Sequence, residues 1–170
     1  GRFNLGICYE NGEGVAEDKA EAVKWYKKAA EQGDADAQDS LGDMYCEGYG
    51  VSQDYSEAVK WYRKAAEQGK ASAQDSLGDM YYYGYGVSQD YSEAIKWYRL
   101  AAEQRNPDAL FQLGECYHNG NGVEQNDIEA CSWYLEAALE GQVEAQCALG
   151  NCFFNGDGII ENLNNAYIYD

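Results

Sequence analysis

Residues 37–72 read AQDSLGDMYCEGYGVSQDYSEAVKWYRKAAEQGKAS, and the next 36 residues repeat most of this segment in register. The same step relates Leu-Gly pairs along the chain, which lie at Leu5-Gly6, Leu41-Gly42, Leu77-Gly78, Leu113-Gly114 and Leu149-Gly150. Trp-Tyr pairs recur at this step too, from Trp25-Tyr26 to Trp133-Tyr134. A fixed period of this length is typical of repeat proteins, in which each repeat is one supersecondary unit.

Each repeat is predicted to be a helical hairpin. In residues 37–72, Leu41 and Tyr45 belong to an apolar stripe at helical spacing, and the stripe ends in the glycine-rich sequence EGYG. A second stripe follows Asp54, which is predicted to cap a second helix while Glu57 reaches back to the cap. A single hairpin cannot bury both stripes, but stacked neighbours can. The chain is therefore expected to be all-α and built from antiparallel hairpins.

The pattern A-x₃-L-G-x₂-Y-x₂-G-x-G-V-x₂-D-x₃-A-x₂-W-Y-x₂-A-A-x₂-G resembles the Sel-one-like repeat, a relative of the tetratricopeptide repeat. The resemblance implies a right-handed α/α superhelix, that is, a solenoid. It also implies that the first helix of each repeat lines a concave groove in which a scaffold or adaptor holds a protein or peptide. We expect one solenoid domain over residues 1–170, with repeats at 1–36, 37–72, 73–108 and 109–144 and a partial repeat at 145–170.

The charge of the chain restricts its partners. Asp and Glu number 30 against 12 Lys and Arg, for a formal net charge of −18. This charge repels phosphates and anionic lipid headgroups, so we expect neither nucleic acid nor a membrane surface as partner. No segment approaches the ~18 consecutive apolar residues of a membrane span, and the first residues lack the layout of a signal peptide. We expect no membrane insertion, and the compartment, cytoplasmic or exported, stays open.

The cysteines are predicted to be core residues rather than crosslinks. Apolar positions of other repeats are taken by Cys8, Cys116 and Cys152, which replace Met44 and Met80, and by Cys131, which replaces Val23, Val59 and Ile95. Cysteine-rich relatives carry a regularly placed pair in each repeat, which this chain lacks. We therefore expect mostly unpaired thiols and a melting temperature that reduction leaves nearly unchanged. Cys116 with Cys131 is the pair to examine for a disulfide.

Catalysis has few candidate residues in this sequence. His118 is the only histidine, so a two-histidine metal site and an HExxH motif are both absent, and we expect no metal, cofactor or catalytic residue. Hydrolase activity of the β-lactamase type is attributed to cysteine-rich relatives, but this chain has no SxxK motif. A hydrolase therefore remains only a weak alternative to a binding protein.

A partner-binding face is predicted on the first helices of repeats two to four. Helical phase places the following residues there: Asp39, Asp43, Asp75, Asp79, Tyr82, Tyr83, Phe111, Glu115 and His118. We expect all four aspartates to be exposed. Carboxylates interleaved with aromatic rings suit a protein or peptide that carries Arg or Lys. Two alternatives stay open: a set of merely hydrophilic surface positions, and a dedicated inhibitor such as an immunity protein against a bacterial toxin.

Overall fold

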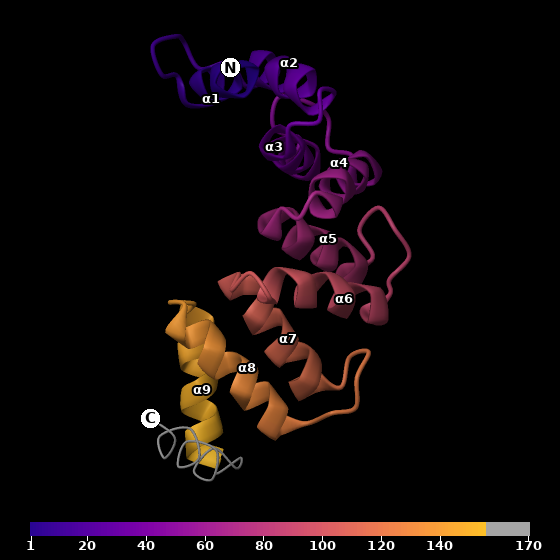
Figure 1. Ribbon diagram of the computed structural model, residues 1–170, viewed down its shortest axis with the longest axis vertical. Helices are drawn as coiled ribbons and strands as arrows, with labels where there is room; N and C mark the ends of the chain where they lie inside the picture. The colour runs from indigo at the N-terminus through magenta and orange to yellow at the C-terminus, as the bar shows by residue number, and fades with distance from the viewer. Residues whose placement is uncertain (156–170) are drawn as a thin grey trace. The chain divides into compact units, whose positions relative to one another are not determined.

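The computed structural model describes residues 1–155, in which short loops connect nine helices and no strand occurs (Figure 1). The helices are α1 (Arg2–Asn11), α2 (Lys19–Ala30), α3 (Ala35–Glu47), α4 (Tyr55–Glu67), α5 (Ala71–Tyr83), α6 (Tyr91–Ala102), α7 (Pro107–Asn119), α8 (Asp127–Leu139) and α9 (Val143–Asn155). Odd-numbered helices are the first helices of the repeats and even-numbered helices are the second ones. The predicted all-α fold of repeated hairpins is confirmed.

The helices gather in two compact units, Gly1–Asp90 with α1 to α5 and Tyr91–Asp170 with α6 to α9. Within each unit every helix packs on the next one along the chain, both inside a repeat and between repeats. The single solenoid domain over 1–170 stays a prediction. Of the predicted partial repeat 145–170, only the part up to Asn155 lies among the described residues.

The second helices begin with the predicted cap. Asp54 accepts a hydrogen bond from the backbone N–H of Glu57 at 3.0 Å, and Asp18 and Asn126 cap α2 and α8 in the same way. The predicted role of the glutamate is wrong, because the backbone N–H of Asp54 donates to the carbonyl of Tyr45 at 2.9 Å and the Glu57 carboxylate binds Lys60 at 2.7 Å. Equivalent pairs join Lys24 to Glu21 and Lys96 to Glu93. An ammonium one turn ahead offers the carboxylate a full positive charge, which a neutral backbone N–H does not.

The end of each second helix requires a left-handed residue. Gly69 supplies it after α4 with a φ of 90°, as glycine does without steric cost. After α6 the equivalent residue is Arg105, which adopts a φ of 60° and is the only non-glycine residue with positive φ in the described chain. Its guanidinium binds the Glu140 carboxylate. Asn106 then caps α7, so this turn is kept without its glycine.

The two helices of a repeat meet where a glycine faces a tyrosine ring. Leu41 is fully buried beside Gly42, and a Cβ added to Gly42 would lie 2.5 Å from the ring of Tyr62. The same contact joins Gly6 to Tyr26 and Gly114 to Tyr134. Glycine in the Leu-Gly pair is therefore required by packing, since any larger residue would displace the ring.

A second glycine sets the contact between successive repeats of the first unit. A Cβ added to Gly50, in the loop after α3, would lie 2.3 Å from the carbonyl oxygen of Lys19 at the start of α2. Gly86, in the loop after α5, approaches the carbonyl of Tyr55 at the start of α4 in the same manner, with 2.4 Å to the added Cβ. Each of these loops therefore rests backbone against backbone on the preceding repeat.

Candidate protein-binding face

The acids of the first helices are held by tyrosines of the second helices. The Tyr62 hydroxyl donates to Asp43 Oδ1 at 2.7 Å in the first unit, and the Tyr134 hydroxyl donates to Glu115 Oε1 at 2.5 Å in the second. Burial raises the pKa of both phenols, and the acceptor carboxylates add to this effect. The phenols therefore stay protonated, and as hydrogen-bond donors on the second helices they orient the carboxylates of the first helices.

In the first repeat, the second-helix tyrosine binds an acid that stands at a different position of the first helix. Ile7 occupies the position equivalent to Asp43, so no carboxylate is present there. The Tyr26 hydroxyl instead donates to Glu10, which lies one helical turn further along α1. A bond between a second-helix tyrosine and a first-helix acid thus occurs in both units although the position of the acid varies.

Asp43 of the first unit has a strongly perturbed pKa. The residue is exposed, yet the surrounding helices desolvate its carboxylate and raise its pKa to about 6, while the Tyr62 hydroxyl opposes this change. Three further acids also raise the pKa through repulsion, namely Asp39, Glu10 and Glu47. Negative charge is therefore concentrated around Asp43, with contributions from acids of both α1 and α3.

Asp39 does not fit the prediction of an exposed acid. It is only 9% exposed, and it accepts a hydrogen bond from the Ser72 hydroxyl of α5. Burial raises its pKa, and the bond to Ser72 opposes this shift. Phe3 and Phe111 occupy the equivalent positions and pack on second-helix tyrosine rings at 5.5 and 5.7 Å between ring centroids. These phenylalanines were the sequence signal that the position faces the core.

The other predicted residues of the first unit differ in exposure. Asp75 and Asp79 are half-buried on α5, as is Tyr82 near its end. Tyr83 is 49% exposed, and its ring contacts Tyr85 of the following loop. Tyr83 therefore belongs to a group of loop-side rings.

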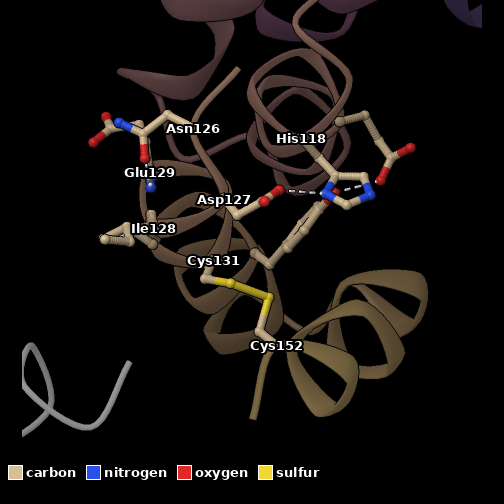
Figure 2. Close-up of a disulfide and its surroundings, with 10 residues drawn as sticks. His118, Asn126, Asp127, Ile128, Glu129, Cys131 and Cys152 are labelled. Atoms are coloured by element: carbon tan, nitrogen blue, oxygen red, sulfur yellow. Dashed lines mark hydrogen bonds and ion pairs between the residues drawn. A yellow bond between two sulfur atoms is a disulfide. The ribbon is translucent and has the colours of Figure 1, made fainter. Parts of the chain in front are cut away.

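In the second unit, His118 and Glu115 lie beside a small hollow of roughly 140 Å³. His118 Nδ1 is 2.8 Å from Asp127 Oδ1, and the pair lies close to a disulfide (Figure 2). Asn151 of α9 and the tyrosine bound to Glu115 complete the polar lining. Sequence reasoning missed Asp127, because it stands directly after the cap of α8 at a position that holds Lys or Tyr in the first three repeats. Phe111 is half-buried and packs into the core of this unit.

The disulfide joins Cys131 of α8 to Cys152 of α9, with 6.1 Å between the Cα atoms. The prediction of mostly unpaired core thiols missed this bond, and Cys116, the partner suggested for Cys131, is buried outside it. The physical reason lies in the stacking between repeats. Val23 and Met44, which are equivalent to the two bonded cysteines, belong to one hydrophobic cluster that spans two repeats. The side chain of Cys131 thus faces the next repeat, where Cys152 lies.

Two further properties concern the described residues 1–155. No group of three or more His, Cys, Asp and Glu side chains in this part of the chain has an arrangement that could hold a metal ion. Its helices include none with the length and apolar character needed to cross a membrane.

Comparison with known proteins places the repeats in a family. The Sel1 repeat model matches residues 1–34, 35–70, 71–106, 107–142 and 143–169. The structure of c5321, a protective antigen of uropathogenic Escherichia coli, is 49% identical with a TM-score of 0.89, and the match covers 92% of this chain and 34% of c5321. A Sel1 repeat protein from Oxalobacter formigenes is 42% identical with a TM-score of 0.86, and the match covers 92% of this chain and 65% of that protein.

A shorter similarity connects the chain to a rat protein. DAP3-binding cell death enhancer 1 from Rattus norvegicus is 55% identical over 40 residues, which are 24% of this chain and 8% of the rat protein. The chain thus spans about a third of c5321, about two thirds of the Oxalobacter protein and a small part of the rat protein. Sel1 repeat proteins typically mediate protein–protein interactions. The match over nearly all residues shows that this chain belongs to the Sel1 repeat family.

Proposed function

We propose that the chain is a protein-binding scaffold whose first-helix acids hold a basic segment of a partner protein. The observation that carries the proposal is the crowding of carboxylates around Asp43, whose pKa is raised to about 6. A cationic side chain placed beside these acids would replace repulsion by attraction and would lower that pKa again. The membership in a family of interaction proteins supports the same conclusion.

The tyrosine bonds make these acids suitable as ligand acceptors. An ionised carboxylate has about four acceptor sites, and the hydroxyl of Tyr62 or Tyr134 uses one of them. The remaining sites of Asp43 and Glu115 can accept N–H donors of a partner. Because the tyrosines already restrict these side chains, less conformational entropy is lost on binding.

His118 and Asp127 are assigned to partner contact in this proposal. Both line the hollow above the disulfide together with Glu115, and the hollow has room for the head of one side chain but not for a folded ligand. In a binding role without catalysis, His118 needs only to form hydrogen bonds with the partner. We extend the proposal to the half-buried Asp79 of α5, which is equivalent to Asp43, and to Asp75, which is equivalent to Asp39 but is half-buried.

The test uses a synthetic peptide of four Arg-Ser repeats with blocked ends, titrated by calorimetry at low salt and at ~0.15 M salt, where the screening length is ~8 Å. The variant Asp43→Asn/Glu115→Gln keeps an oxygen for each tyrosine but removes two charges. The control Glu67→Gln/Glu103→Gln removes two charges at exposed sites near the ends of second helices. Each exposed ion pair contributes ~0.2–1 kcal/mol, so the first variant should weaken binding about 2- to 30-fold and reduce its salt dependence.

The control distinguishes a site from a general charge effect. If the peptide binds the first-helix acids, the Glu67→Gln/Glu103→Gln protein should keep nearly the wild-type affinity. Equal losses in both variants would show that the peptide responds only to net charge, and the proposed face would have to be abandoned.

A further inference from the structure

Four tyrosines of the first unit form a continuous group of rings, here called the tyrosine ladder: Tyr55, Tyr82, Tyr83 and Tyr85. Tyr85 stacks on Tyr55 with 5.0 Å between centroids and on Tyr83 with 5.6 Å. Tyr82 meets Tyr83 edge to face at 4.9 Å. The rings come from the start of α4, the end of α5 and the loop after α5.

The ladder exposes much of its aromatic surface. Tyr83 is 49% exposed and Tyr85 is 45% exposed, so neither ring is a core residue. The near-parallel planes of the stacked rings, at centroid distances of 5.0 and 5.6 Å, indicate offset stacking, which leaves part of each ring face uncovered. Exposed, grouped tyrosines are typical of protein interfaces, where they give large contact area at a small cost in conformational entropy.

The preceding repeat shows which kind of group this position accepts. Lys19 is equivalent to Tyr55, and Tyr49 is equivalent to Tyr85. The Lys19 ammonium lies over the Tyr49 ring at 4.5 Å from its centroid. The position that stacks Tyr55 on Tyr85 therefore places a cation, Lys19, on the ring of Tyr49 in the preceding repeat.

The charge of the chain favours a cation from outside. With a formal net charge of −18, the protein attracts positive side chains, and Asp54 precedes the first ring of the ladder directly. A guanidinium is planar, weakly hydrated and able to stack on aromatic faces, whereas an ammonium is a compact and strongly hydrated charge. We infer that the tyrosine ladder is a docking surface for arginine side chains of a partner protein. The surface uses rings rather than the first-helix carboxylates, so it goes beyond the proposed function.

The chain itself supplies conservative variants for the test. Asn119 and Asn121 are equivalent to Tyr83 and Tyr85 and stand in a repeat that folds into the same hairpin. The double variant Tyr83→Asn/Tyr85→Asn should therefore keep its helicity, which circular dichroism checks. The gain-of-function variant Lys19→Gln removes the internal cation from Tyr49 and should create a second ring site.

The probe is a blocked peptide, Gly-Ser-Arg-Gly-Ser-Arg-Gly, compared with versions in which lysine, citrulline or proline replaces arginine. Citrulline keeps the planar shape of arginine without its charge. Binding is followed by NMR on protein with carbon-13-labelled tyrosine rings. The arginine peptide should shift ladder resonances, and Tyr83→Asn/Tyr85→Asn should weaken binding about 5- to 30-fold, as expected for the loss of two cation–ring contacts. In Lys19→Gln, the Tyr49 resonance should shift as well.

Three results would overturn the inference. They are equal binding of the citrulline peptide, stronger binding of the proline peptide, or unchanged affinity in Tyr83→Asn/Tyr85→Asn. The variant Asp43→Asn/Glu115→Gln separates this surface from the proposed function. Ladder shifts that persist in that variant support an independent arginine site, whereas shifts that vanish would show that the carboxylates alone capture the peptide.

Discussion

Reduction of the Cys131–Cys152 disulfide is expected to destabilise the second unit by about 3 kcal/mol. The crosslink joins residues 21 positions apart. A closed loop of this length removes ~11 cal/mol/K of chain entropy from the unfolded state, which is ~3 kcal/mol at 25 °C. The bond connects α8 to α9, so the loss should be largest for the hairpin-to-hairpin contact that these helices form. This expectation replaces the sequence-based one, in which reduction leaves the melting temperature nearly unchanged.

The assay is urea denaturation of the oxidised and the reduced protein, followed by circular dichroism. The matched control is Cys131→Val/Cys152→Met, which copies the equivalent pair Val59 and Met80 and so keeps an apolar contact without a crosslink. The urea midpoint of this variant should not change on addition of reductant, and it should be lower than that of the oxidised wild type. Equal midpoints for oxidised and reduced wild type, with the bond verified by mass spectrometry, would refute the reasoning.

The same geometry predicts a new crosslink. Ile95 and Cys116 are equivalent to the two bonded cysteines, and both are buried. Ile95→Cys should therefore form a disulfide with Cys116 on air oxidation. Mass spectrometry under non-reducing conditions and a thiol titration would detect the bond. Persistence of both thiols under oxidising conditions would show that the contact between repeats is not equivalent along the chain.

Five further substitutions test packing and charge. Leu77→Ala should cost ~2–5 kcal/mol because the residue is fully buried, and Leu5→Ala should cost less because it is half-buried; equal shifts of the urea midpoint would contradict the stacking. Gly42→Ala should destabilise by ~1–3 kcal/mol, since its Cβ would lie 2.5 Å from a tyrosine ring. In Gly150→Ala the added Cβ meets nothing within 4 Å among residues 1–155, so this variant should stabilise by ~0.5–1 kcal/mol in thermal melts. The pKa of Asp43 is raised to about 6 in the folded state against ~3.9 unfolded, so wild-type stability should fall as pH rises from ~4 to ~6. Asp43→Asn should remove this fall, and it should raise the stability at pH 7 but not below pH 4. The gain should be much smaller than the full pKa shift would give, because the residue is exposed. A parallel dependence of stability on pH in both proteins would count against the shifted pKa.

The hairpins could be predicted from the sequence because their signals are local and repeated. Caps such as Asp54, the glycines that end helices, and the Leu41-Gly42 pair each act within one hairpin, and the period multiplies every signal. Arg105 was recognisable as a departure from the glycine pattern, and the structure shows that an arginine can adopt the left-handed conformation there.

The candidate site could be predicted only in part, because it depends on contacts between repeats. Helical phase placed Asp43 and Asp39 on one face, but the approach of Ser72 from the next repeat buries only Asp39. The pairing of Cys131 with Cys152 likewise depends on which helix lies beside α8. The phenylalanines at positions equivalent to Asp39 indicated its burial, whereas the pairing of the cysteines required the contact between α8 and α9.

The loop glycines have a consequence for how such an array can diversify. Gly50 and Gly86 place loop backbone on the backbone at the start of the preceding second helix, so this spacing does not depend on neighbouring side chains. Surface residues such as Tyr83 and Tyr85 can therefore be exchanged, as Asn119 and Asn121 illustrate, while the register of the hairpins is retained. Selection can then change ligand preference one repeat at a time, because the two glycines keep the arrangement of the hairpins constant while surface residues change.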